Sequence, residues 1–329
     1  MTTGPHPALA GVSGQPAAGD AAGGAVRLSP PDLSPWLGGE VRGVVTRDSG
    51  VAGPHAAVVA LMHGNEIGGA IVVEALLRSG LSPARGRLSF ILANPDAYAR
   101  FDPADPTASR FLEEDMNRLW AGDVLAGPPR SLELRRAQAL LPVLRTVDLL
   151  LDLHSMLLQP EPILLLRAAR ASLGLAQEVG VPSLVVADHG HPTGLRLIDH
   201  AQFVDGPGRA LLLEAGLHWE PATVDCMRVA TLRFLAAADM IAYPPPPAAA
   251  PQRFAQVTHT IVPQSHRFAF AQRVRGGEVI AEEGTLLATD GNEEIRTPYP
   301  DCLLVMPAPR AVRGHTAVRL ARFGEMRLP

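Results

Sequence analysis

Short, continuous apolar runs alternate with longer helical stretches through the first two thirds of the chain, and this alternation limits the fold most. The apolar runs cover residues 56–62, 87–93, 147–154, 162–166, 182–188 and 209–215. The helical stretches cover residues 66–80, 131–145 and 221–243. Because the short runs show no polar alternation, strands formed from them must be buried on both faces. The pattern predicts an α/β fold with a sheet flanked by helices on both faces.

Composition divides the chain into four segments. Residues 1–28 are rich in Gly, Ala and Pro and have no periodicity, which predicts a flexible N-terminal tail. The α/β domain is expected over residues 29–243. Residues 244–251, PPPPAAAP, predict a stiff, extended linker. From 252 to 329, short runs of β-forming residues are separated by Gly and Pro, which predicts a small C-terminal β-domain.

Charge and residue usage exclude several classes of function. The 329 residues have a net charge of −4 and no basic stripe, which argues against a nucleic-acid partner. No apolar run approaches the length of a membrane span, and the first residues do not resemble a secretory signal. The two cysteines, Cys226 and Cys302, are far apart, so we expect a reducing, cytoplasmic location. All 29 basic residues are arginine, which excludes chemistry that needs a lysine.

The motif HGNE, residues 63–66, directly follows the apolar run 56–62. This position places His63 at the edge of the sheet, where open α/β folds bind ligands. Glu66 is expected in the first turn of the next helix, where the helix dipole favours a carboxylate. An imidazole and a carboxylate at this spacing can converge on one ion. A polar turn without a ligand is the alternative, and the motif by itself does not decide between them.

Two further apolar runs also finish on polar residues. His154 ends the run 147–154, and with His63 and Glu66 it would complete the His2Glu set of several catalytic zinc sites. Asp152, two residues earlier, could orient a ligand or pair with a backbone group or an arginine. Glu214 closes the run 209–215. It is a candidate general base, unless it simply emerges into solvent.

The stretch SRFLEEDMNRLW covers residues 109–120. Three residues in it, Arg110, Asn117 and Arg118, are candidates for contact with a bound molecule. A planar guanidinium can hold a carboxylate or polarise a carbonyl group. A solvated, charged turn is the alternative for a stretch of this composition.

Taken in order, these motifs resemble the succinylglutamate desuccinylase and aspartoacylase family, which is related to the zinc carboxypeptidases. The resemblance rests on HGNE, on an arginine seven residues before the NR of DMNR (115–118), on DLH (152–154) and on the strand-end glutamate at 214. It covers about residues 30–243. It extends more weakly to CLLVMPAPRAVRGHTAVRLA in the β-domain. The resemblance implies a zinc carboxypeptidase-like mixed sheet and a zinc-dependent hydrolase acting on carbon–nitrogen amide bonds.

The resemblance also implies roles for particular residues. One Zn²⁺ per chain would be bound by His63, Glu66 and His154. Glu214 would take a proton from the zinc-bound water and deliver it to the leaving amine, while Arg110 would stabilise the oxyanion. The remaining pair, Asn117 and Arg118, would hold the carboxylate of a small N-acyl amino acid substrate.

One departure from the family pattern bears on the substrate. Aspartoacylases have a further substrate-binding arginine about ten residues before the strand-end glutamate, where this chain has Val204. Arg196 and Arg209 are near in sequence but not at that position. The departure favours a short or neutral acyl group, such as acetyl, over aspartate or succinate. His189 and His191 could reach the pocket or a second metal, although surface histidines are the simpler interpretation.

Other functions remain open from the sequence. The same residues could serve a zinc carboxypeptidase acting on peptides, or a non-catalytic metal-binding protein of the same fold. A serine hydrolase is disfavoured because no G-x-S-x-G motif is present. The C-terminal β-domain is expected to form a wall or lid beside the site. It could also serve assembly into a homo-oligomer.

Overall fold

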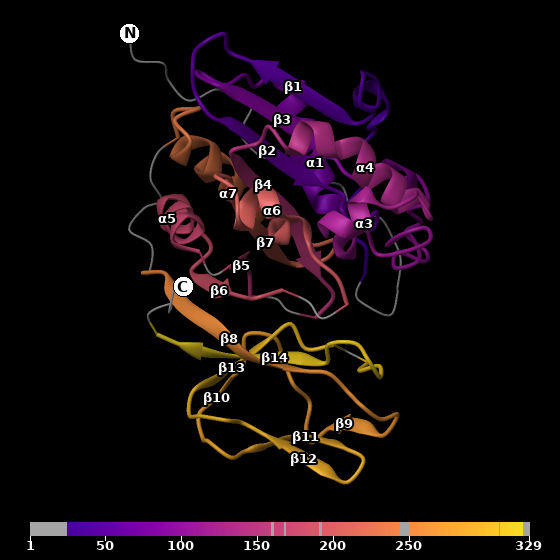
Figure 1. Cartoon of the computed structure of the whole chain (residues 1–329), viewed down its shortest axis with the longest axis vertical. Coiled ribbons are helices and arrows are strands. Elements are labelled where there is room, and N and C mark those ends of the chain that lie inside the picture. Colours follow the sequence, from indigo (N-terminus) through magenta and orange to yellow (C-terminus); the bar gives the residue numbers. More distant parts are fainter. Residues whose placement is uncertain are drawn as a thin grey trace.

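The computed structural model describes residues 25–158, 161–167, 169–190, 193–243, 251–308 and 310–324. These residues build one mixed sheet of eleven strands in the order β1-β3-β2-β4-β7-β5-β6-β8-β14-β13-β10 (Figure 1). Its strands are β1 (Val44–Asp48), β2 (His55–Ala60), β3 (Arg87–Leu92), β4 (Leu149–Met156), β5 (Ile163–Leu166), β6 (Leu184–Ala187), β7 (Arg209–Leu217), β8 (Arg253–Ile261), β10 (Val279–Ile280), β13 (Cys302–Val305) and β14 (Val318–Phe323). A second sheet joins β12 (Glu293–Arg296), β11 (Leu286–Asp290) and β9 (Phe268–Phe270).

The centre of the large sheet is parallel. Strands β3, β2, β4 and β7 run in the same direction, while β1 and β5 are antiparallel to their neighbours β3 and β7. Every residue of β2, β4, β5 and β6 is buried, as their continuous apolar sequences predicted. The expected α/β class with a mixed sheet is therefore confirmed.

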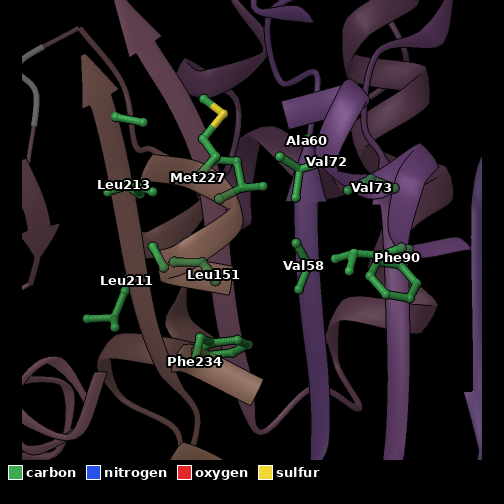
Figure 2. Packing of buried hydrophobic residues seen from close by; sticks show 14 of the residues in the cluster. Val58, Ala60, Val72, Val73, Phe90, Leu151, Leu211, Leu213, Met227 and Phe234 are labelled. Atoms are coloured by element: carbon green, nitrogen blue, oxygen red, sulfur yellow. The ribbon is translucent and has the colours of Figure 1, made fainter. Parts of the chain in front are cut away.

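Helices cover both faces of this sheet. The described helices are η2 (Ser34–Trp36), α1 (Ile67–Arg78), α2 (Pro95–Tyr98), η3 (Met116–Arg118), α3 (Gly122–Ala126), α4 (Leu132–Leu144), α5 (Arg170–Val179), η4 (Leu197–Asp199), α6 (Ala201–Val204) and α7 (Pro221–Ala237). On one face, Val58, Leu151 and Leu213 pack with α1 and α7 through residues such as Val72 and Met227 (Figure 2). On the other face, alternate strand residues pack against α4. Alternation along each strand thus fills two separate cores.

Two predicted boundaries shift. Val26 and Leu28, which the sequence placed in the flexible tail, are buried at 0% and 2% exposure and belong to the same core as α1 and α7. The reason is hydrophobic burial, because moving two apolar side chains from water into the core stabilises the folded chain. Helix α7 ends at Ala237 rather than at residue 243. Residues 1–24, and 244–250 of the predicted linker, lie outside the described residues.

The C-terminal strands continue the large sheet. Strand β8 pairs in parallel with β6, and β14, β13 and β10 follow as antiparallel neighbours. In Figure 1 these orange and yellow strands lie at the opposite end of the molecule from β1. The division into two domains between residues 251 and 252 stays a prediction. Strand β8, which follows that division, is hydrogen-bonded to β6 of the α/β part.

Within the described ranges, no helix is both long and apolar enough to cross a membrane. The cytoplasmic location and the homo-oligomer stay predictions.

Candidate metal and catalytic site

The predicted site residues come from neighbouring strand ends. His63 follows β2, His154 lies near the end of β4, and Glu214 lies in β7 directly opposite His154 in the register. The chain leaves β2 through α1 toward β3 on one side, while β4 pairs with β7 on the other. Connections that diverge in this way open a crevice at the carboxyl ends of the strands. The topology therefore brings three distant sequence motifs to one place.

The HGNE turn is fixed by close backbone packing. A Cβ atom on Gly64 would lie 2.4–2.5 Å from backbone atoms of Ala97, Tyr98 and Ser109, so only glycine fits there. The amide of Gly64 donates to the carbonyl of Arg110 at 3.0 Å, which ties the turn to the segment 109–120. Glu66 is the N-cap residue of α1, one position before the expected first turn. Its side chain makes no capping hydrogen bond and faces the histidines instead.

The three predicted ligands converge. Glu66 Oε1 lies 2.7 Å from His63 Nδ1, and Glu66 Oε2 lies 3.0 Å from His154 Nδ1. One ligand atom from each residue falls within 4.8 Å of the other two, and all three side chains are buried. Two imidazole nitrogens and a carboxylate oxygen at this spacing fit a divalent transition metal such as zinc.

Carboxylates also contact the far side of both imidazole rings. Asp115 Oδ1 lies 3.0 Å from His63 Nε2, and Asp152 Oδ2 lies 3.0 Å from His154 Nε2. The Asp115 contact is a hydrogen bond, whereas Asp152 and His154 are close without being aligned as one. A carboxylate in such a position can orient a metal-binding histidine and raise its basicity. Of the two interpretations left open for Asp152, its position fits the orienting one. Asp115 had no assigned role, although it stands within the quoted DMNR motif.

The charges around the three candidate ligands favour the binding of a cation. Burial would raise the pKa of Glu66, but His63 and His154 outweigh it and hold that pKa well below its usual range. Burial would lower the pKa of His154, yet Asp152 and Glu66 raise it well above the ordinary value. Three carboxylates surround two imidazoles, so positive charge is favourable here, whether from a proton or from a metal ion.

Arg110 is the cationic side chain beside the candidate ligands. Its guanidinium lies 3.4 Å from Glu66 Oε1, 3.4 Å from Asp115 Oδ2 and 2.9 Å from His63 Nε2. The side chain is 39% exposed, so part of the guanidinium faces outward and can reach a bound molecule. Such a group can stabilise negative charge that develops on a substrate oxygen.

Glu214 is buried and lacks a full set of partners. It is 6% exposed, and its Oε2 atom has no hydrogen bond among the described residues. Burial raises its pKa to about 8, and the nearby Glu66 and Asp152 carboxylates add to the shift. The solvent-exposed alternative is thereby excluded. A carboxyl group with a pKa near neutrality can both accept and return a proton.

Comparison with known protein families identifies the central part of the chain. Residues 52–203 match the model of the succinylglutamate desuccinylase/aspartoacylase catalytic domain. This segment carries HGNE, DMNR and DLH, the motifs on which the resemblance rests. No curated protein shows a significant sequence match.

Several solved structures have the same fold as this chain. A succinylglutamate desuccinylase from Vibrio cholerae is 18% identical, with a TM-score of 0.68 over 85% of each chain. The ectoine utilization protein EutE (DoeB) from Ruegeria pomeroyi is 16% identical, with a TM-score of 0.59 over 82% of this chain and 85% of that one. Murine aminoacylase 3 is 18% identical, with a TM-score of 0.60 over 83% of this chain and 96% of that one.

The two residues to which the family pattern assigns substrate binding make hydrogen bonds within the chain. Asn117 is buried, and its side-chain oxygen accepts the amide of Leu197 at 2.9 Å. Arg118 donates to the carbonyl of Asn117 at 2.7 Å. A cavity opens beside the candidate ligands, and neither Asn117 nor Arg118 lines it. Their substrate contact stays a prediction.

The arginine missing at Val204 has no evident replacement among the described residues. Arg196 is buried and paired with Asp188 at 2.9 Å and Asp199 at 2.8 Å. Arg209 begins β7, at the opposite end of that strand from the candidate site. His189 lies near a separate groove with Gln256 rather than among the ligands, and His191 lies outside the described residues.

A cavity of about 210 Å³ opens beside the candidate ligands. Its lining residues are His63, Glu66, Arg110, Ser155, Met156, Leu157, Leu158, Glu214, His218, Met306, Pro307 and Ala308. Four of the seven predicted site residues are therefore on the cavity wall, and another, His154, contacts one of them, Glu66. Sequence reasoning missed Ser155 and His218. Both stand within a few residues of predicted strand ends, which was the available signal.

Proposed function

We propose that this protein is a zinc-dependent hydrolase that cleaves the amide bond of a small N-acyl amino acid, with one metal ion per chain. The observation that carries the proposal is the convergence of His63, Glu66 and His154 beside the buried Glu214 on one cavity. A His2Glu set with an open position is a ligand arrangement of catalytic zinc sites. When bound, the zinc ion would act as a Lewis acid that polarises the carbonyl group and lowers the pKa of water.

The residues of the chain would divide the proton transfers and charge stabilisation among them. Glu214 would accept a proton from the attacking water and return it to the leaving amine, a role that its position on the cavity wall and its unpaired Oε2 atom support. Arg110 would donate hydrogen bonds to the carbonyl oxygen as negative charge develops there. Asp115 and Asp152 would hold the two imidazole rings in the orientation needed for metal binding.

Cavity size separates this proposal from its main rivals. A volume of about 210 Å³ suits a small amide better than an extended peptide, which disfavours a carboxypeptidase. A metal-binding protein without activity would have no need of a buried carboxyl group with an unpaired oxygen, which costs free energy. The unpaired oxygen of Glu214 therefore favours an enzyme.

A substrate screen tests the proposal. Purified protein supplied with zinc is incubated with a panel of N-acyl amino acids and, separately, with short unblocked peptides, and free amine is measured. We expect amine release from N-acyl amino acids that is abolished by a chelator and restored by zinc. Release from peptides alone would contradict the deacylase proposal and favour the carboxypeptidase.

A further inference from the structure

His218 and Ser155 form a hydrogen-bonded pair on the cavity wall. Ser155 Oγ lies 2.6 Å from His218 Nδ1, and both residues line the cavity beside the candidate ligands. They are 63 positions apart in sequence and are both buried. Neither has a role in the proposed chemistry, so the pair calls for an explanation of its own.

The chain holds His218 in place with unusual backbone geometry. Trp219 has a φ of +60°, a left-handed conformation that costs free energy for a bulky residue. Its indole donates to the carbonyl of Asn65 at 2.9 Å, within the HGNE turn. The amide of His218 donates to the carbonyl of Met156 at 2.7 Å. The turn after β7 is therefore fastened both to the ligand loop and to the end of β4, with His218 between them on the cavity wall.

The hydrogen bond to Ser155 fixes which ring nitrogen carries the proton. The distance of 2.6 Å between Ser155 Oγ and His218 Nδ1 is shorter than is usual for an N–H donor but suits an O–H donor, so we assign the Ser155 hydroxyl as the donor to Nδ1. A neutral ring then carries its hydrogen on Nε2. That atom has no hydrogen bond to any described residue, and it belongs to a side chain on the cavity wall. It is a donor available to a bound molecule.

Burial keeps this imidazole uncharged. Burial lowers the pKa of His218 to about 4; Glu66 acts to raise it, but the nearby Arg110, His63 and His154 also act to lower it. At neutral pH the ring can donate a hydrogen bond but cannot balance a carboxylate. The wall also includes Met156, Leu157 and Met306, which are uncharged, and Arg110, the cationic lining residue. In the proposed function Arg110 already faces the carbonyl oxygen, so a carboxylate on the acyl group would have to compete for it or be buried without a cationic partner, which is costly.

We propose that His218 is a substrate-contact residue that determines specificity. Through Nε2–H it donates a hydrogen bond to the acyl half of the substrate, and with the apolar wall it admits short, uncharged acyl groups and disfavours acyl groups that carry a carboxylate. The inference rests on the proposed deacylase function and names the acyl class that the same site accepts.

Two substitutions separate the two ring nitrogens. In His218→Asn the amide group can reach the position of Nδ1 and keep the bond to Ser155, but it leaves the Nε2 position empty. In His218→Gln the longer side chain can place its amide nitrogen near the Nε2 position. His259→Asn, at an exposed histidine on β8, is the matched control. Metal content and melting temperature are measured for each variant, so that losses from misfolding are recognised.

The assay compares kcat/KM for N-acetyl and N-succinyl derivatives of one amino acid. We expect the wild type to prefer the N-acetyl compound by about 100-fold or more, given the cost of an unpaired buried charge. His218→Asn should lose about tenfold on the N-acetyl compound, the effect of one neutral hydrogen bond, with a smaller loss in His218→Gln. A preference for the N-succinyl compound, or a loss in His218→Gln as large as in His218→Asn, would overturn the proposal.

The outcome also distinguishes this inference from the proposed function. If the wild type cleaves no compound, the deacylase proposal fails, and calorimetric binding of the same uncleaved compounds tests the subsite. Tighter binding of the N-acetyl compound, weakened in His218→Asn, supports the assignment of His218. Equal or tighter binding of the N-succinyl compound overturns it.

Discussion

The two histidines that flank β2 are buried to the same extent but have opposite surroundings. His55 begins the strand, His63 follows its end, and each is 4% exposed. The ring of His55 is bonded only to uncharged groups, with Nε2 2.8 Å from Ser89 Oγ and Nδ1 3.0 Å from Thr146 Oγ1. The ring of His63 lies between the carboxylates of Glu66 and Asp115. Burial and residue type do not distinguish a structural histidine from a metal ligand, but the charge of its partners does.

The difference follows from the two ends of the parallel strands. At the amino end, the His55 amide donates to Asp148, and the strands β2 and β4 are joined by a closed set of hydrogen bonds. At the carboxyl end, the connections diverge and leave a cavity. The same strand thus has one end whose polar groups satisfy each other and one end whose polar groups face a space for a ligand.

Replacing each histidine should give the largest contrast. His63→Ala should lose the bound metal and reduce turnover on the order of 10³-fold or more, because it removes a proposed ligand. His55→Ala should keep the metal and the turnover of folded protein, and lower the free energy of unfolding by about 2 kcal/mol. Metal analysis, activity and urea denaturation of both variants provide the measurement. Equal metal loss in the two variants would break the comparison.

Replacing Arg110 should have the next largest effect on turnover. Arg110→Gln should lower kcat by about 10²–10³-fold while the metal is retained, since it removes the cation proposed to face the developing oxyanion. Arg130→Gln is the control, because Arg130 is a half-exposed arginine that pairs with Glu114, away from the candidate ligands. Steady-state kinetics and metal analysis measure the effect. An Arg110→Gln enzyme as fast as the Arg130→Gln control would exclude the proposed role.

Replacing Asp115, beside the candidate ligands, and Asp148, at the amino end of the parallel strands, should change the metal affinity of the protein to different extents. Asp115→Asn should weaken metal binding by about 10–100-fold, because Asp115 contacts the far nitrogen of His63. Asp148→Asn removes the carboxylate beside His55 and should leave metal affinity unchanged. Competition with a chelator gives both affinities. No difference between the variants would show that Asp115 does not orient the ligand.

The smallest expected effect is the pH dependence that His55 gives to stability. Burial lowers its pKa below the usual 6.5 in the folded chain. Below pH 6.5 the unfolded chain therefore binds a proton that the folded chain does not, so stability falls as the pH falls. The contribution stays under about 1.4 kcal/mol per pH unit, the limit for one proton. Urea denaturation at about pH 7.5 and about pH 5.5, on either side of the ordinary histidine pKa, should show a shallower fall in His55→Gln than in the wild type. An unchanged slope would contradict this.

Sequence reasoning recovered the features that depend on local pattern. Continuous apolar runs predicted the buried strands, and polar residues at their ends indicated His63, Glu66, His154 and Glu214 as neighbours. The N-cap of α4 follows a local rule of the same kind, because Ser131 accepts a hydrogen bond from the amide of Leu134. The buried strands and the candidate residues at their ends needed only the periodicity of a strand and the rule that parallel strands share a carboxyl edge, whereas the roles of those residues came from the family resemblance.

The features that escaped prediction depend on tertiary contacts. The pairing of β8 with β6 joins segments about 70 residues apart in sequence, and the linker composition between them suggested separation instead. The contact of Asp115 with His63 spans 52 positions, and that of Ser155 with His218 spans 63. No short motif records such contacts. A wall from the C-terminal segment was expected, but no motif singled out Met306, Pro307 and Ala308 as the residues that line the cavity.

The most direct test of the account is Glu214→Gln in zinc-supplied protein, with metal content and turnover measured on the same sample. The glutamine side chain has nearly the same shape as the glutamate but cannot accept the proton. We expect about one zinc ion per chain in both proteins, together with a fall in kcat of about 10²–10⁴-fold in the variant. Unchanged turnover with the metal still bound would contradict the assignment of Glu214 as the general base.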